Sequence, residues 1–132
     1  MNIISTYEQI KEELKAIQSD LEIEMSEDAN EAQYRGNKLA VHMARTGKLL
    51  ADAKIHRDRK LTSGVVEELK KVLSLPASTA NKYIDALCYD ENYLVNWCER
   101  VNRTSTHQLD WCRTVISKAK AEMNAFGNNQ ST

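Results

Sequence analysis

Proline and glycine are scarce in this chain of 132 residues, which contains one Pro and four Gly. Both residue types weaken helices, so their scarcity favours a mainly helical fold. Apolar runs are also short, and none approaches the roughly 18 residues that a membrane-spanning helix needs. The first ten residues lack the basic and apolar regions of a signal peptide. We therefore expect an all-α, cytoplasmic protein without membrane contact.

Cysteine is also sparse, and its spacing does not fit a disulfide or metal framework. Cys88, Cys98 and Cys112 form no CxxC pair, and three thiols cannot all pair within one chain. His42 and His56 are too far apart along a helix to share one metal ion. No Ser or Cys has an evident catalytic partner. We predict reduced cysteines, surface histidines, no metal, no cofactor, no small-molecule substrate and no enzymatic activity.

Charge is balanced overall, with a formal net charge of −1, but it is distributed unevenly. Nine acids and two lysines occupy residues 1–31, whereas eight basic and two acidic residues occupy residues 32–61. Two neighbouring helices of opposite charge would pair along their rims and favour an antiparallel register. A basic surface that meets nucleic acid is one alternative, and an ordinary solvated face is another. The basic residues of the nucleic-acid alternative are Arg45, Lys48, Arg57, Arg59 and Lys60.

The first half of the chain has the apolar periodicity of an N-terminal αα-hairpin. A capping box begins at Thr6, ahead of apolar residues spaced three and four apart over residues 7–21. A second helix, capped by Asp28 and covering about residues 29–56, carries a line of small residues: Gly36, Ala40, Ala44, Gly47 and Ala51. Small side chains let another backbone approach, so we expect close packing or a local bend at the two glycines.

Residues 91–126 contain no Pro or Gly and carry apolar residues at helical spacing, so they predict one long helix. These apolar residues are Leu94, Cys98, Val101, Cys112, Val115, Ala119, Met123 and Phe126. Such a helix would be roughly 54 Å long and would need partners along most of its length. Ser105 and Gln108 fall on its inward line, where polar groups need hydrogen-bond partners. A continuous helix with one polar layer is our leading interpretation, and a kink and a functional pocket are the alternatives. Gly127 is a natural residue to follow a helix end, so the helix is predicted to end near Phe126, before a disordered polar tail at residues 127–132.

One side of this helix holds the candidate partner-binding residues. Its charged members recur three or four residues apart, which places them where they can bind an anion or an acidic partner. Trp97 and Trp111 also share one side, either as core anchors or as contacts for a partner protein. The candidate site residues are Arg103, His107, Asp110, Trp111 and Arg113.

Residues 65–87 resemble a helix-turn-helix, with helices predicted over about 64–73 and 77–88 on either side of Pro76. The resemblance implies a DNA-facing side that includes Ser78, Thr79, Asn81 and Lys82. A plain helical corner is our preferred interpretation, because the second helix offers phosphates little positive charge. The residues expected to point inward from that helix are Ala80, Tyr83, Ile84 and Leu87.

Three segments resemble parts of small helical proteins encoded by bacteriophages and prophages. They are GKLLADAK at residues 47–54, NYLVNWCERVNRTSTHQLDWCRT at 92–114 and SKAKAEM at 117–123. The resemblance implies a cytoplasmic accessory protein that acts beside phage DNA metabolism or against a host factor. We predict a single domain over residues 1–126, a bundle of four or five helices that self-associates or binds a protein partner. A nucleic-acid-binding accessory protein is the alternative.

Overall fold

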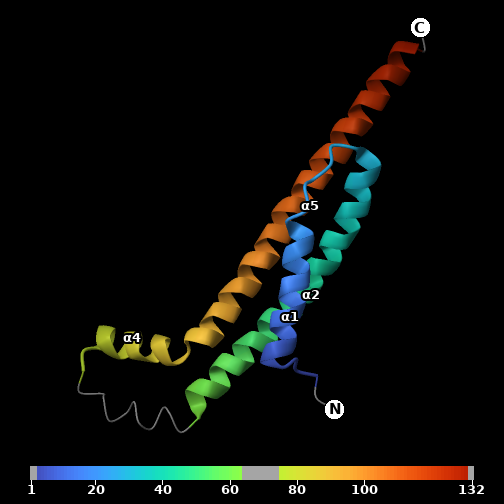
Figure 1. The fold of residues 1–132 in the computed structure, drawn as a ribbon. Helices are drawn as coiled ribbons and strands as arrows, with labels where there is room; N and C mark the ends of the chain where they lie inside the picture. The colour runs from blue at the N-terminus through green and yellow to red at the C-terminus, as the bar shows by residue number, and fades with distance from the viewer. Residues whose placement is uncertain (1–2, 64–74, 131–132) are drawn as a thin grey trace.

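The computed structural model describes residues 3–63 and 75–130, and within these ranges the chain is helical with no strand. Its helices are α1 (Tyr7–Leu21), α2 (Ala29–Thr62), α4 (Ala77–Leu87) and α5 (Tyr89–Gln130). Figure 1 shows α2 and α5 as two long rods that lie alongside each other, with α1 beside them. The predicted all-α class and long C-terminal helix are confirmed. The helix predicted over residues 64–73 lies outside the described residues.

α2 and α5 form an antiparallel pair that contains most of the core. Near the middle of the pair, Asn102 Nδ2 on α5 donates to the Met43 carbonyl at 3.0 Å and to Thr46 Oγ1 at 2.9 Å. Gly36, nearer the start of α2, lies opposite Leu109 and Cys112, nearer the end of α5. The buried apolar side chains that these two helices contribute are Ala32, Leu39, Leu49, Ala53, Leu94, Val95, Cys98, Val101 and Cys112.

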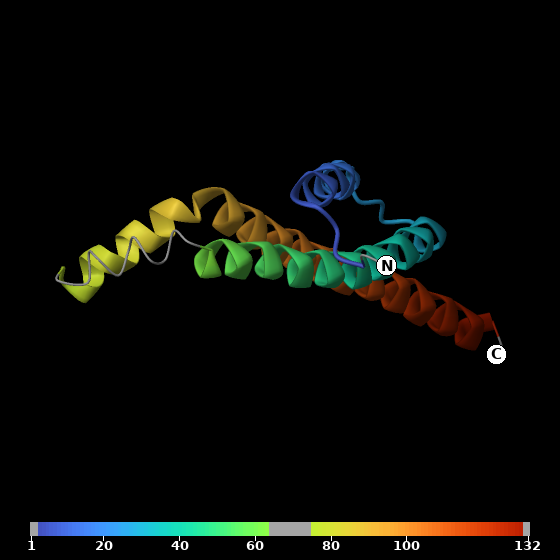
Figure 2. The same cartoon turned by 90° about the horizontal axis from the view of Figure 1, so that it is seen from below.

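α1 packs to one side of this pair, as Figure 2 shows most clearly. The predicted capping box at Thr6 is present, because Thr6 accepts from the Gln9 backbone and the Gln9 side chain accepts from the Thr6 backbone. One face of α1 is buried through Ile10, Leu14, Ile17 and Leu21. That face completes the core over α2 and α5.

Two side-chain contacts join α1 to α2. Glu13 forms an ion pair with Arg45, and the Asp20 carboxylate lies 2.9 Å from His42 Nε2, within hydrogen-bond distance. The order of these contacts shows that the two helices run in opposite directions, which confirms the predicted hairpin and its antiparallel register. His42 is half-buried, so it is not the free surface histidine that the sequence suggested.

The segment before α1 is tied to the middle of α2. The Ser5 backbone N–H donates to the Asp52 carboxylate at 2.9 Å, and His56 Nε2 donates to the Ser5 carbonyl at 2.7 Å. Asp52 is 4% exposed and also pairs with Lys48. Burial by itself raises the pKa of Asp52, but the hydrogen bonds from Lys48 and Ser5 outweigh it and hold this pKa below its ordinary value. His56 is therefore also half-buried and bonded rather than free at the surface.

Two helix ends lie beyond their predicted positions. α2 continues past His56 to Thr62, and Lys60 in this last part pairs with Glu91 of α5 at 2.9 Å. α5 continues past Phe126 to Gln130, so residues 127–130 are helical rather than part of a disordered tail. A glycine that caps a helix has a positive φ, and no described glycine has one. Gly127 therefore continues the helix and does not cap it.

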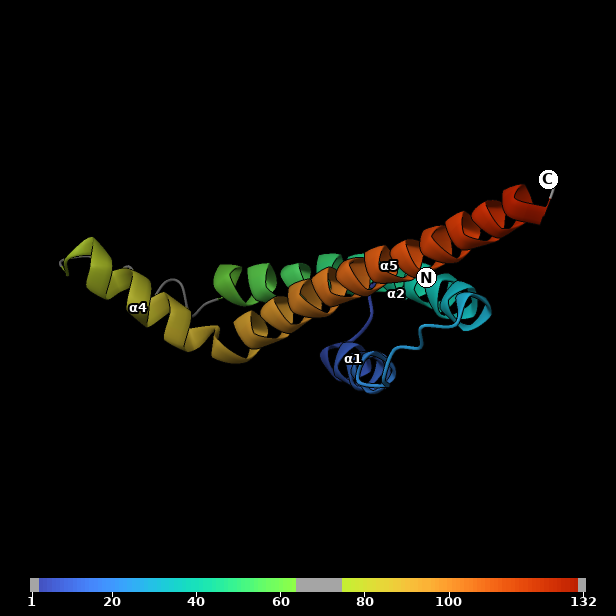
Figure 3. The same cartoon turned by 90° about the horizontal axis from the view of Figure 1, so that it is seen from above.

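α4 contributes little to the described core. Figure 3 shows it extending away from the α2–α5 pair, and none of its residues is fully buried. Tyr83 is 53% exposed, so the prediction that it points inward is wrong, whereas Ala80, Ile84 and Leu87 are half-buried. Because α4 extends away from the paired rods, the described helices leave Tyr83 uncovered.

Candidate partner-binding surface

α5 is longer than the helix that covers it. Because Gly36 lies opposite Leu109 and Cys112, and α2 begins seven residues before Gly36, α2 runs out opposite about residue 118 of α5. We call residues 119–130 the overhang. Figure 1 shows it projecting past the first turn of α2. At 1.5 Å per residue it extends roughly 17 Å beyond the covered part of the helix.

The apolar residues of α5 that face the core form a stripe along one side of the helix, and the overhang continues this stripe. Val115 and Ile116 are half-buried at the edge of the core, and Ala119, Met123 and Phe126 follow at spacings of three and four. Met123 is 74% exposed and Phe126 is 65% exposed. Large apolar side chains that lie adjacent on one helix face and stay exposed are typical of a surface that binds another molecule.

The predicted site residues occupy the part of α5 just before the overhang. All five are exposed, and Trp111 is 36% exposed. His107 and Trp111 line one hollow of about 500 Å³ together with Met25 and Thr104. The charged residues Arg103, Asp110 and Arg113 do not line it, and Asp110 pairs with Arg113 at 3.3 Å instead. The structure therefore brings together two members of the predicted site and separates the other three from them.

The two tryptophans have different environments. Trp97 is half-buried against the core, and its Nε1 donates to Gln18 of α1 at 3.3 Å. It matches the predicted core anchor. Trp111 lies at the surface beside the segment that joins α1 to α2. Of the pair, Trp111 is the one placed to contact a partner.

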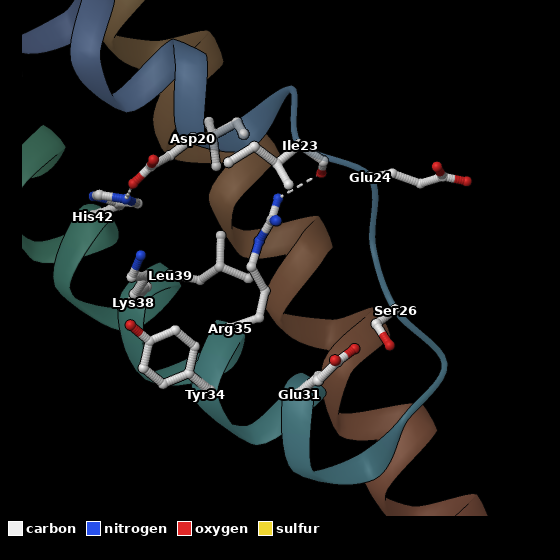
Figure 4. A pocket seen from close by; sticks show the side chains of 11 residues that line it. Asp20, Ile23, Glu24, Ser26, Glu31, Tyr34, Arg35, Lys38, Leu39 and His42 are labelled. Atoms are coloured by element: carbon white, nitrogen blue, oxygen red, sulfur yellow. Dashed lines mark hydrogen bonds and ion pairs between the residues drawn. The ribbon is translucent and has the colours of Figure 1, made fainter.

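A second hollow, of about 310 Å³, lies where the end of α1 and the joining segment face α2. Figure 4 shows Asp20 against His42 and Arg35 bonded to the Ile23 carbonyl at 3.1 Å, whereas Glu24 points away from the hollow. Lys38 Nζ lies 5.2 Å from the centre of the Tyr34 ring. These groups satisfy each other, which is the arrangement of a structural joint.

The polar layer predicted in the middle of α5 forms part of this joint. Gln108 Nε2 donates to the Leu21 carbonyl at 2.9 Å, and Gln108 Oε1 accepts from Arg35 at 2.9 Å. The buried Ser105 hydroxyl donates to the Val101 carbonyl. α5 is continuous through these residues, so the leading interpretation is confirmed and the kink is wrong. The role of Arg35 was not predicted, since the sequence gives no signal that it faces Gln108.

Most of the basic residues that were candidates for binding nucleic acid have an acidic neighbour in the structure. Arg45 and Lys48 pair with Glu13 and Asp52. Arg57 and Lys60 lie near acids as well, at 3.5 Å from Asp58 and 2.9 Å from Glu91 respectively. Arg59, Ser78, Thr79 and Lys82 are exposed. The first helix and turn of the helix-turn-helix resemblance fall mainly in residues outside the described ranges.

Chemically reactive groups are few in the described part of the chain. Burial raises the pKa of Cys98 to about 12, and it raises the pKa values of Cys88 and Cys112 as well. A thiol with such a pKa stays protonated near neutral pH and is a poor nucleophile. In residues 3–63 and 75–130, no three His, Cys, Asp or Glu side chains gather in a way that could hold a metal ion. No helix in these ranges has the length and apolar character to cross a bilayer.

The fold and this surface define an all-α protein whose antiparallel helix pair leaves one end of α5 uncovered. Comparisons with protein-family models, curated proteins and solved structures find no match.

Proposed function

We propose that this protein is a non-enzymatic helical interaction module and that it binds another protein through the apolar stripe of the overhang. The observation that carries the proposal is the exposure of Met123 and Phe126 on a helix whose earlier turns bury the same stripe. Removing apolar surface from water is favourable, so a bare stripe of this kind favours association with another molecule.

The surroundings of the overhang extend this surface. Trp111 and His107 lie about two and about three turns before the overhang on α5, and both line the exposed hollow formed with Met25. Tryptophan is one of the residues that most often contribute strongly to binding at protein interfaces. The proposed contact surface therefore runs from Trp111 to Phe126. We also propose a cytoplasmic, phage-type accessory role, which rests on the resemblance of the three segments named above.

A nucleic-acid-binding role has less support. Electrostatic binding to phosphates requires several free cations on one surface. Arg45, Lys48 and Lys60 each have an acid partner, which reduces the positive charge that they offer. If the protein nevertheless shifts DNA or RNA at low salt, and if that binding weakens steeply as salt rises, the interaction-module proposal would be replaced.

The proposal can be tested in the native cell with a photo-crosslinking amino acid. Placed at Met123, it should form a covalent adduct with a protein on illumination, because this side chain would lie inside the interface. The matched control is Ala121, which is exposed on the opposite side of the same overhang. The absence of an adduct at Met123, or equal yields at the two positions, would contradict the proposal.

A further inference from the structure

We infer that the overhang binds the overhang of a second copy of this chain, with the two helices antiparallel. This inference rests on the proposed function and specifies its partner. It follows from three features of the described residues: the continuity of the stripe with the α2–α5 interface, the sizes of the side chains along it, and the position of the acids near its base.

The first argument is continuity. Over its covered part, the stripe of α5 packs against α2, a helix that runs in the opposite direction. α2 begins opposite about residue 118 of α5, and beyond that point the stripe goes on through Ala119, Met123 and Phe126. A second helix that lies antiparallel to α5, alongside the overhang, would continue the same packing. The overhang of another copy is a helix of matching length and character, and a two-fold axis lets each copy cover the other.

The second argument is side-chain size. With a two-fold axis near Met123, an antiparallel register places Phe126 of one copy against Ala119 of the other. The small side chain then leaves room for the large ring, twice in the dimer, while the two Met123 side chains meet near the axis. A parallel register would place Phe126 against Phe126 and Ala119 against Ala119. That arrangement crowds one layer and leaves a void in the other, and both effects destabilise packing.

The third argument is charge. Exposed acids lie where the joining segment enters α2, beside the base of the overhang: Glu27, Asp28 and Glu31. A parallel pair would bring the acidic clusters of both copies to the same end, where they repel each other. The antiparallel pair holds the two clusters at opposite ends of the shared overhang. Like-charge repulsion therefore favours the same register as side-chain size.

The short overlap determines the strength of this dimer. An overlap of roughly 17 Å is three turns of helix, which places the interface at the small end of specific protein contacts. We therefore expect a weak dimer whose population rises with protein concentration. Light scattering on the purified protein should show a mass that increases from one chain of 15.0 kDa toward two.

The variant Met123→Glu with Phe126→Glu tests the stripe. It should remain monomeric over the same concentrations, with a dissociation constant raised at least tenfold. The matched control is Ala121→Glu with Ala125→Glu, which adds the same charge to exposed positions away from the stripe and should dimerise like the parent. Circular dichroism checks that all three proteins keep their helix content. A parent that stays monomeric, or a control that is disrupted as strongly as the stripe variant, would overturn the inference.

Disulfide trapping tests the direction. A mixture of Ala119→Cys and Phe126→Cys chains should form a mixed disulfide, because these positions face each other in the antiparallel register. The three native cysteines are buried and should not compete. A disulfide that forms more readily between two Phe126→Cys chains would show a parallel dimer instead. If the purified protein is monomeric while Met123 still crosslinks to a different protein in cells, the proposed function stands and only the second copy is rejected.

Discussion

The covered part of α5 and its overhang belong to one helix and carry one apolar stripe, yet their environments differ. Leu94, Val101 and Cys112 are each 1% exposed beneath α2 and α1, whereas Met123 and Phe126 are mostly exposed. The spacing of apolar residues is the same in both parts. Periodicity thus shows which side of a helix is apolar, and the length of the neighbouring helix determines where that side is covered.

The largest effect expected from this difference is on stability. Leu39→Ala removes a buried side chain from the α2–α5 interface and should lower the free energy of unfolding by about 2–5 kcal/mol. Met123→Ala should change it by less than about 0.5 kcal/mol, because an exposed side chain leaves no cavity. Urea unfolding, measured at a protein concentration low enough to keep the chain monomeric, compares the two. Equal losses would show that the overhang is covered within its own chain.

An intermediate effect is expected from a buried charge in the covered region. The pKa of Asp52 is lowered in the folded protein, so its ionised form stabilises the fold above the ordinary carboxyl pKa of about 4. This contribution is lost as the pH falls through the lower, folded-state pKa. Asp52→Asn should therefore cost about 1–3 kcal/mol at pH 7 and progressively less in acid.

Urea unfolding of the parent and Asp52→Asn proteins at pH 7, and at successively lower pH, measures this dependence. Glu122→Gln is the matched change in the overhang, where the side chain is exposed, and it should have little effect at any of these pH values. A cost for Asp52→Asn that does not change with pH would mean that its hydrogen bonds, and not its charge, carry the contribution.

The smallest effect concerns two glycines. A Cβ at Gly47 would meet nothing within 4 Å, so Gly47→Ala should raise the free energy of unfolding by about 0.5–1 kcal/mol through helix propensity alone. Gly127 is equally open but lies three residues from the end of α5, where helix propensity matters less. Gly127→Ala should give a smaller gain. Thermal unfolding monitored by circular dichroism can rank the two, and a loss at Gly47 would reveal a contact that its open surroundings do not explain.

Much of the fold could be predicted because local signals and tertiary packing agree. Thr6 and Asp28 begin their helices as side-chain caps, and both positions followed from the sequence. The polar layer at Gln108 was also predicted, since a polar residue on an apolar line needs a partner. Its actual partner, Arg35, is distant in sequence and could not be identified from spacing.

The errors in the fold have local physical reasons. Gly36 fits the expected close approach to α5, but Gly47, on the same line of small residues, has open space around it. The residue type alone did not distinguish them. The end of α5 was placed too early because Gly127 was interpreted as a cap, although it continues the helix. Tyr83 was placed inward because the sequence does not specify the direction in which α4 leaves α5.

The candidate site was only partly predictable. Trp111 and His107 share a hollow as members of one predicted cluster, but Arg103, Asp110 and Arg113 of the same cluster do not line it. Met123 and Phe126 were recognised as part of the stripe and not as site residues. Their importance depends on where α2 begins in space, and a single sequence does not give the register between two helices.

The attachment of residues 3–5 to α2 determines where a label can be added without disturbing the overhang. Lys48 donates to the Ile3 carbonyl at 2.6 Å, and the Ser5 backbone is bonded to Asp52 and His56. Figure 1 places this start of the chain far from the tip of α5. A fluorophore or purification tag fused ahead of Met1 should leave the bare helix tip accessible, whereas the same fusion after Thr132 would sit next to it. The choice of fusion end can therefore change a measured affinity before any residue is mutated.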